Sequence, residues 1–113
     1  MSNRPAQLAN LVSHLGDLEV VLAFDPNCQW SNHFSRSLST AKWLSSAGAS
    51  QQQLNELSSS VTSVFGGMGS FNDYAPVRPA GNGTYAVIPG MESLTEVSGR
   101  VYDSAVALRV IEA

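Results

Sequence analysis

The chain has little charge and a single cysteine, and both shortages exclude classes of function. Of its 113 residues 13% are charged, about half of the quarter that is usual in globular proteins. Six Lys and Arg residues stand against nine Asp and Glu residues, which gives a net charge of -3. Nucleic-acid binding is disfavoured, because phosphate contacts need clustered basic residues. Cys28 alone forms neither an internal disulfide nor a multi-cysteine zinc or iron–sulfur site.

Long hydrophobic runs are also missing. No apolar run approaches the roughly 20 residues of a membrane span. The first residues, MSNRPAQLANL, lack the long apolar segment of a signal peptide. With 43% hydrophobic residues, the chain is long enough to close a modest core. We therefore expect a soluble, cytoplasmic protein with a single domain over 1–113 and no contact with a membrane.

Apolar residues at helical spacing predict four helices. The clearest stripe consists of Leu54, Leu57, Val61, Val64 and Phe65. The first stripe continues through residues 18–24, a β-branched run that a strand could also form, and this continuity favours a helix there. The expected fold is mainly α, a four-helix bundle-like domain with helices near residues 5–24, 26–47, 50–65 and 92–111.

Capping residues indicate where three of these helices begin. Asp25-Pro26 is typical of an N-cap followed by proline in the first turn. Ser50 with Gln53 and Ser93 with Glu96 both have the spacing of a capping box, in which the two side chains bond the backbone at the helix start.

Residues 66–90 interrupt the helical pattern with six glycines and three prolines. Asn82-Gly83 is a strong signal for a hairpin turn, and residues 85–88 favour a strand. We expect a short β-hairpin or an ordered loop here, before the last helix. A connection this long inside a compact domain is usually functional or disordered.

The segment FGGMGSFNDY, residues 65–74, is the most distinctive string in the chain. It lacks the lysine of a P-loop and the third glycine of a dinucleotide-binding fingerprint. A structural role is favoured for its glycines, which would end a helix and form a tight turn. We expect Gly66, Gly67 and Gly69 to shape this loop, with Asn72 and Asp73 closing it by bonding backbone amides.

The same string resembles that of a family of small bacterial proteins of unassigned function, in which a helix ends in an FGGMGSFND loop. The residues that carry the resemblance are Gly66, Gly67, Met68, Gly69, Phe71, Asn72 and Asp73. A helix with a tryptophan (Trp30 to Phe34) and the Asn82-Gly83 turn are looser matches. Some members lie beside polymorphic toxins, so the resemblance implies an immunity-type role. It brings no catalytic residues, and the serine-rich stretch from Ser31 to Ser46 departs from the pattern.

Candidates for catalysis or metal binding are few. Cys28 and His33 would diverge on a helix and could pair only if the helix begins between them. His14 and His33 could meet Asp73, but their spacing does not indicate a metal site. We predict no catalytic residue, no metal and no cofactor.

The sequence favours a non-catalytic protein-interaction module, such as an immunity protein that neutralises a toxin. Its acidic charge would suit a basic partner. The alternative is a small enzyme or ligand-binding domain with a pocket under residues 66–74, using Asp73 with His14 or His33. A homodimer through Val106 and Val110 of the last helix is a third hypothesis. The expected partner-binding residues are Met68, Phe71, Asn72, Asp73, Tyr74 and Trp43.

Overall fold

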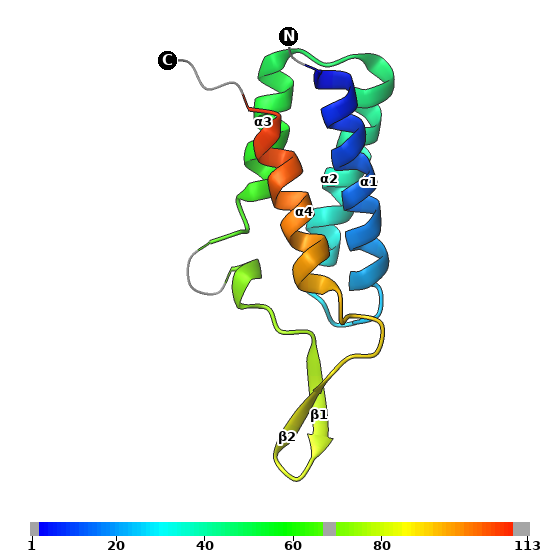
Figure 1. The fold of residues 1–113 in the computed structure, drawn as a ribbon, viewed down its shortest axis with the longest axis vertical. Helices are drawn as coiled ribbons and strands as arrows, with labels where there is room; N and C mark the ends of the chain where they lie inside the picture. Colours follow the sequence, from blue (N-terminus) through cyan, green and yellow to red (C-terminus); the bar gives the residue numbers. More distant parts are fainter. Residues whose placement is uncertain (1–2, 67–69, 110–113) are drawn as a thin grey trace.

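The computed structural model describes residues 3–66 and 70–109, and this part of the chain contains four α-helices (Figure 1). Helix α1 packs against both α2 and α4, and α3 packs against the same two helices. The mainly α fold is therefore confirmed, as is the helical state of residues 18–22. The helices are α1 (Arg4–Leu22), α2 (Ser31–Ala47), α3 (Gln51–Thr62) and α4 (Leu94–Ala107).

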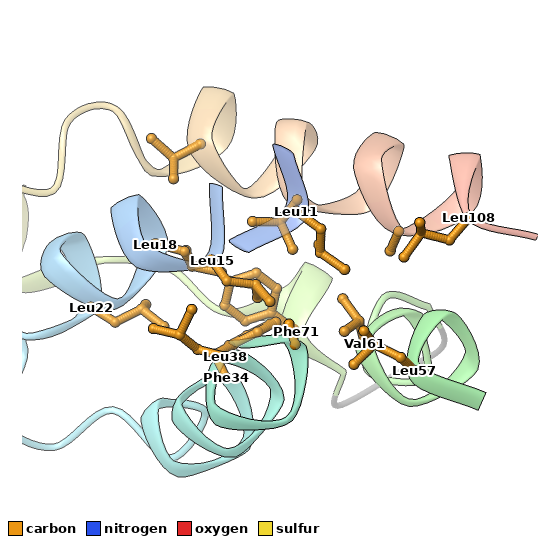
Figure 2. Close-up of a cluster of buried hydrophobic side chains, with 14 of the residues drawn as sticks. Leu11, Leu15, Leu18, Leu22, Phe34, Leu38, Leu57, Val61, Phe71 and Leu108 are labelled. Carbon is orange, nitrogen blue, oxygen red and sulfur yellow. The ribbon is translucent and has the colours of Figure 1, made fainter. Parts of the chain in front are cut away.

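The hydrophobic core lies between the helices, where their apolar stripes meet (Figure 2). Leu11, Leu15 and Leu18 of α1 are fully buried, and each such leucine contributes about 1.5–3 kcal/mol by leaving water. The other buried apolar side chains on the helices are Leu8, Val21 and Leu22 of α1, Phe34, Leu38, Ala41 and Leu44 of α2, Leu54, Leu57 and Val61 of α3, and Leu94, Val97, Val101 and Ala105 of α4.

Helix α2 begins at Ser31, five residues later than the sequence predicts. The Asp25 carboxylate accepts a hydrogen bond from the Asn27 backbone N–H at 3.0 Å, and the Asp25 carbonyl accepts one from the Cys28 N–H at 3.2 Å. Asp25 therefore closes a turn in the connection between α1 and α2 and is not the N-cap of a helix. This connection places the Trp30 ring 6.0 Å from that of Phe71.

The two predicted capping boxes have different outcomes. At Ser50 the box is complete, with the Gln53 N–H donating to the Ser50 hydroxyl at 3.1 Å and the Ser50 N–H donating to Gln53 Oε1 at 2.9 Å. Ser93 precedes α4 but makes no side-chain cap, because its ψ of 7° is not the extended value of an N-cap. The carboxylate of Glu92 instead accepts from the Gly90 N–H at 2.9 Å.

A two-stranded hairpin precedes α4, as one of the two sequence alternatives predicts. Strands β1 (Val77–Gly81) and β2 (Thr84–Val87) are antiparallel. Asn82 and Gly83, with φ of 54° and 73°, form the turn that an Asn-Gly pair favours. Every residue of both strands is exposed. The hairpin extends beyond the ends of the helices and, within the described residues, packs against none of them (Figure 1).

Candidate functional site

The loop between α3 and the hairpin is anchored in the core by Phe71, the first residue of the short 3-10 helix η1 (Phe71–Asp73). Phe71 is 5% exposed, and its ring lies 5.0 Å from that of Phe34 and 5.3 Å from that of Phe65. The hypothesis that Phe71 contacts a partner directly is corrected by this position, since the side chain packs inside the protein. Its role is to hold the loop in place.

Tyr74 fixes the other end of the loop. Its phenol donates a hydrogen bond of 2.5 Å to Asp25 Oδ2, and its ring stacks on Phe71 with an angle of 14° between the planes. Burial raises the pKa of Tyr74 well above its usual value, and the hydrogen bond to Asp25 raises the pKa further. The phenol therefore stays protonated and acts as a donor that ties the loop to the α1–α2 connection.

Between these anchors the loop exposes Asn72 and Asp73. The Phe71 N–H donates to the Val64 carbonyl at 2.8 Å and closes the loop. The Ser70 hydroxyl accepts from the Asn72 N–H at 3.3 Å and caps η1. This capping role of Ser70 was not among the predicted ones, although a serine one residue before a short helix is a recognisable signal.

The predicted glycine roles are only partly covered by the structure. Helix α3 ends at Thr62 with Ser63 as its C-cap, so Gly66 does not end the helix as expected. Gly67, Met68 and Gly69 lie outside the described residues, and so do the turn predicted for the two glycines and the partner contact predicted for Met68.

A groove of about 360 Å³ runs between this loop and α4. Tyr102, 40% exposed, borders it, and its ring packs edge-on against Phe65 at 5.3 Å. A smaller groove of about 170 Å³ adjoins it and shares Asn72, Thr95 and Ser98. The lining of the larger groove is Phe65, Asn72, Thr95, Ser98, Gly99, Tyr102 and Asp103. Sequence reasoning missed Tyr102 and Asp103, which lie outside the buried stripe of α4.

Trp43 lies in a different groove. It is 60% exposed and borders a hollow of about 490 Å³ between α2 and α3, together with His33 and Arg36. Asn72 does not line this hollow, so the structure does not bring Trp43 to the predicted loop surface. Tyr74 and Asn72, in contrast, share a groove.

His33 is the most perturbed basic group described. Its Nε2 atom is buried without a hydrogen-bond partner. Burial lowers the pKa of His33, the positive charge of Arg36 lowers it further, and the adjacent backbone of Ser60 and Val61 partly offsets both effects. Of the two grooves described beside residues 70–74, neither has His14 or His33 in its lining.

The described residues show neither a metal cluster nor a membrane-crossing helix. No three His, Cys, Asp or Glu side chains gather closely enough there to hold a metal ion. Of the helices described, none combines the length and apolarity that a membrane crossing requires.

The fold and site thus define a small helical domain with a projecting hairpin and an anchored polar loop. The chain belongs to the family described as a domain of unknown function, DUF6966, whose model matches residues 25–84. The matched segment contains α2, α3 and η1 and reaches the first residue of β2. Neither a curated protein nor a solved structure matches the chain.

Proposed function

We propose that this protein is a non-catalytic protein-interaction module of the immunity type, which binds and neutralises a toxin. The contact surface is the exposed side of residues 70–74 with the adjoining groove on α4. The observation that carries the proposal is the construction of the loop. Asn72 and Asp73 are exposed, while the residues on either side of them, Phe71 and Tyr74, are held by the core and by Asp25.

Residues 70–74 are suited to binding because they are ordered before the partner arrives. Ordering a flexible loop on association costs affinity, and an anchored loop avoids that cost. Tyr102 adds an exposed aromatic ring beside the loop, and tyrosine is among the residues that contribute most to protein interfaces. Polar side chains and one aromatic ring therefore lie together on this surface.

The charge of this surface favours a basic partner. The larger groove has Asp103 in its lining and neither lysine nor arginine, and the exposed Asp73 is next to Asn72 on the loop. The whole chain has a net charge of -3. Complementary charge accelerates association and selects between partners, so a basic toxin such as a nuclease is the expected class.

The proposal is tested by partner capture followed by affinity measurement. The full chain is immobilised, a stoichiometric basic protein is isolated from a bacterial lysate, and its Kd is measured with purified variants. Asn72→Ala with Asp73→Ala should weaken binding at least about tenfold, a loss of about 1.4 kcal/mol, and added salt should slow association. Trp43→Ala, an exposed change in the other groove, is the matched control.

Three results would contradict this function. In the first, the folded wild type captures no protein. In the second, the loop variant binds the partner as tightly as the wild type does. In the third, only Trp43→Ala abolishes binding. A positive result is extended by expressing the protein with the captured partner and measuring cell survival, which an immunity protein should restore.

Small-ligand binding is the second candidate, and the α2–α3 hollow favours it over the loop. That hollow has the volume of many ligand sites. Its lining includes Arg36, Trp43 and His33, whose buried Nε2 atom has no hydrogen-bond partner. A titration with small aromatic carboxylates tests this candidate. Binding is measured by the fluorescence of Trp43 in a Trp30→Phe background. A saturable change that His33→Gln abolishes would support it.

A further inference from the structure

The two edges of the hairpin differ in their capacity to pair with another strand. On the outer edge of β1, Pro79 has no N–H to donate. The N–H of Val77 donates to the Ala75 carbonyl of the same chain at 2.9 Å. This edge therefore offers no free donor at either position, and a proline placed there is a common protection against strand addition.

The outer edge of β2 is open. The Ile88 N–H donates to the Pro76 carbonyl at 2.8 Å, which identifies residues 76 and 88 as a bonded pair of the ladder. Opposing pairs in an antiparallel ladder alternate between bonded and non-bonded, and Val87 is opposite Val77 while Tyr85 is opposite Pro79. Both of these pairs are non-bonded. The N–H and C=O groups of Tyr85 and Val87 consequently point away from β1.

We propose that two copies of this chain dimerise by antiparallel pairing of β2 with β2 around a two-fold axis at Ala86. In this register Tyr85 lies opposite Val87 of the partner subunit, and each such pair exchanges two backbone hydrogen bonds. The four outward groups of one strand are thereby satisfied by the same four groups of the other. The edge is complementary to itself, which a two-fold interface requires.

Side chains and charge are compatible with this register. Tyr85 and Val87 are 69% and 47% exposed. Pairing places the ring of Tyr85 beside the β-branched side chain of Val87 in the other copy, and an aromatic residue opposite a β-branched one is a favourable cross-strand pair. Arg78 is the one charged residue in 77–87. The two copies of Arg78 would be three strand spacings apart, about 14 Å, which exceeds the screening length of about 8 Å at physiological salt.

The arrangement also stops at two copies. The resulting four-stranded sheet has β1 as both outer strands, and Pro79 blocks each of them. Because the hairpin extends beyond the helices (Figure 1), antiparallel pairing places the two helical bodies at opposite ends. Strands of four residues bury well under the about 1,200 Å² of a stable interface, so the dimer is weak and depends on concentration.

Analytical ultracentrifugation over a wide concentration range tests the proposal. The wild type should shift from one to two times the monomer mass as concentration rises. Tyr85→Lys with Val87→Lys places like charges opposite each other and should weaken dimerisation at least about tenfold. Tyr85→Glu with Val87→Lys places opposite charges together in this register and should restore it. Val77→Lys, on the blocked edge, is the control and should dimerise like the wild type.

A disulfide test fixes the register independently. Ala86 of one copy faces Ala86 of the other as a non-bonded pair, whose Cα atoms lie about 4.5 Å apart, within the range of a disulfide. In a Cys28→Ser background, Ala86→Cys should form a covalent dimer under mild oxidation. Ala80→Cys, at another exposed position but on β1, should not.

The proposed dimer is contradicted if the wild type does not dimerise or if something other than a second copy pairs with the β2 edge. A wild type that remains monomeric at every concentration, or whose β2 amides are protected from hydrogen exchange only by another protein, overturns dimerisation through this edge. So does a dimer that tolerates the two lysines and is lost instead with Val106→Lys on α4. Circular dichroism of the hairpin variants should show unchanged helix content, because the hairpin does not pack on the helices.

Discussion

Tyr74 and Asp25 are 49 residues apart in the sequence, and a hydrogen bond of 2.5 Å joins the phenol oxygen of one to a carboxylate oxygen of the other. Asp25 also accepts from the Asn27 N–H, so one side chain organises the α1–α2 connection and the end of the η1 loop. Two segments that belong to no helix are thereby held together. The proposed contact surface depends on this bond for its order.

Removing the phenol oxygen should loosen the loop. We expect Tyr74→Phe to lower the free energy of unfolding by about 1–2 kcal/mol, since it leaves a partly buried carboxylate without one partner. Amide hydrogen exchange at residues 71–74 should accelerate as well. Tyr85→Phe, an exposed position, is the control and should change the free energy of unfolding by less than about 0.5 kcal/mol. Equal stability of the two variants would contradict the role of this bond.

Phe71 should be one of the most sensitive positions in the chain. Its ring is buried among four others, and Phe71→Ala should cost about 3–5 kcal/mol by loss of burial and cavity formation. Trp43→Ala removes a larger but exposed ring and should cost much less. Urea denaturation of both variants decides the point. A Phe71 variant as stable as the Trp43 variant would show that the loop is not anchored as described.

The two serines before α3 and α4 provide a matched pair. Ser50→Ala removes a complete capping box and should lower the free energy of unfolding by about 1 kcal/mol. Ser93→Ala removes a side chain that caps nothing and should leave the free energy of unfolding nearly unchanged. Thermal or urea unfolding measures both. A larger loss at Ser93 than at Ser50 would contradict the cap assignments.

Two glycines should respond to alanine in opposite directions. Gly99 lies on the exposed side of α4, and an added Cβ meets nothing within 4 Å, so Gly99→Ala should stabilise by about 0.5–1 kcal/mol. Gly90 has a φ of +96°, and a Cβ there would lie 2.8 Å from the Phe24 ring. Gly90→Ala should therefore destabilise by more than about 1 kcal/mol. Unfolding midpoints that move in the same direction would refute one of the two assignments.

The stability of the protein should decrease in acid partly because of His33. Its pKa in the folded protein is below the ordinary value of 6.5, so the unfolded chain takes up this proton more readily. The free energy of unfolding consequently falls as the pH decreases below about 6.5. In His33→Gln this contribution is absent, and urea midpoints between about pH 7.5 and pH 5 should depend less on pH. An unchanged dependence would count against the burial of this imidazole.

Local signals predicted the elements of this fold better than they predicted the site. Ser50 with Gln53, and Asn82 with Gly83, act through neighbours in the chain, so the capping box and the hairpin turn follow from the sequence. Ser93 has the same spacing as Ser50, but it lies in a turn after the buried Met91, where the Leu94 N–H donates to the Met91 carbonyl and the Ser93 backbone is not extended. Asp25-Pro26 also has the form of a helix start, yet Asp25 closes a turn by bonding the N–H groups of Asn27 and Cys28. Its carboxylate also accepts from Tyr74, 49 residues away in the sequence.

The site depended on tertiary contacts that no spacing shows. Phe71 is adjacent in sequence to the exposed Asn72 and Asp73, and it is buried only because Phe34 of α2 and Phe65, which follows α3, pack against it. Tyr102 became part of the groove because Phe65 and Asn72 line it together with α4. Trp43 is exposed, but it borders the hollow between α2 and α3 and not the groove beside residues 70–74.

The arrangement of the helices also determines when the protein can fold during synthesis. Helix α1 rests against both α2 and α4, and α4 leaves the ribosome after the other three described helices. Until then Leu11 and Leu15 lack part of the apolar surroundings that bury them in the folded structure. The segment that matches the family model, residues 25–84, contains neither α1 nor α4. That segment on its own should remain unfolded, and the nascent chain should close its core only after Leu108 has emerged.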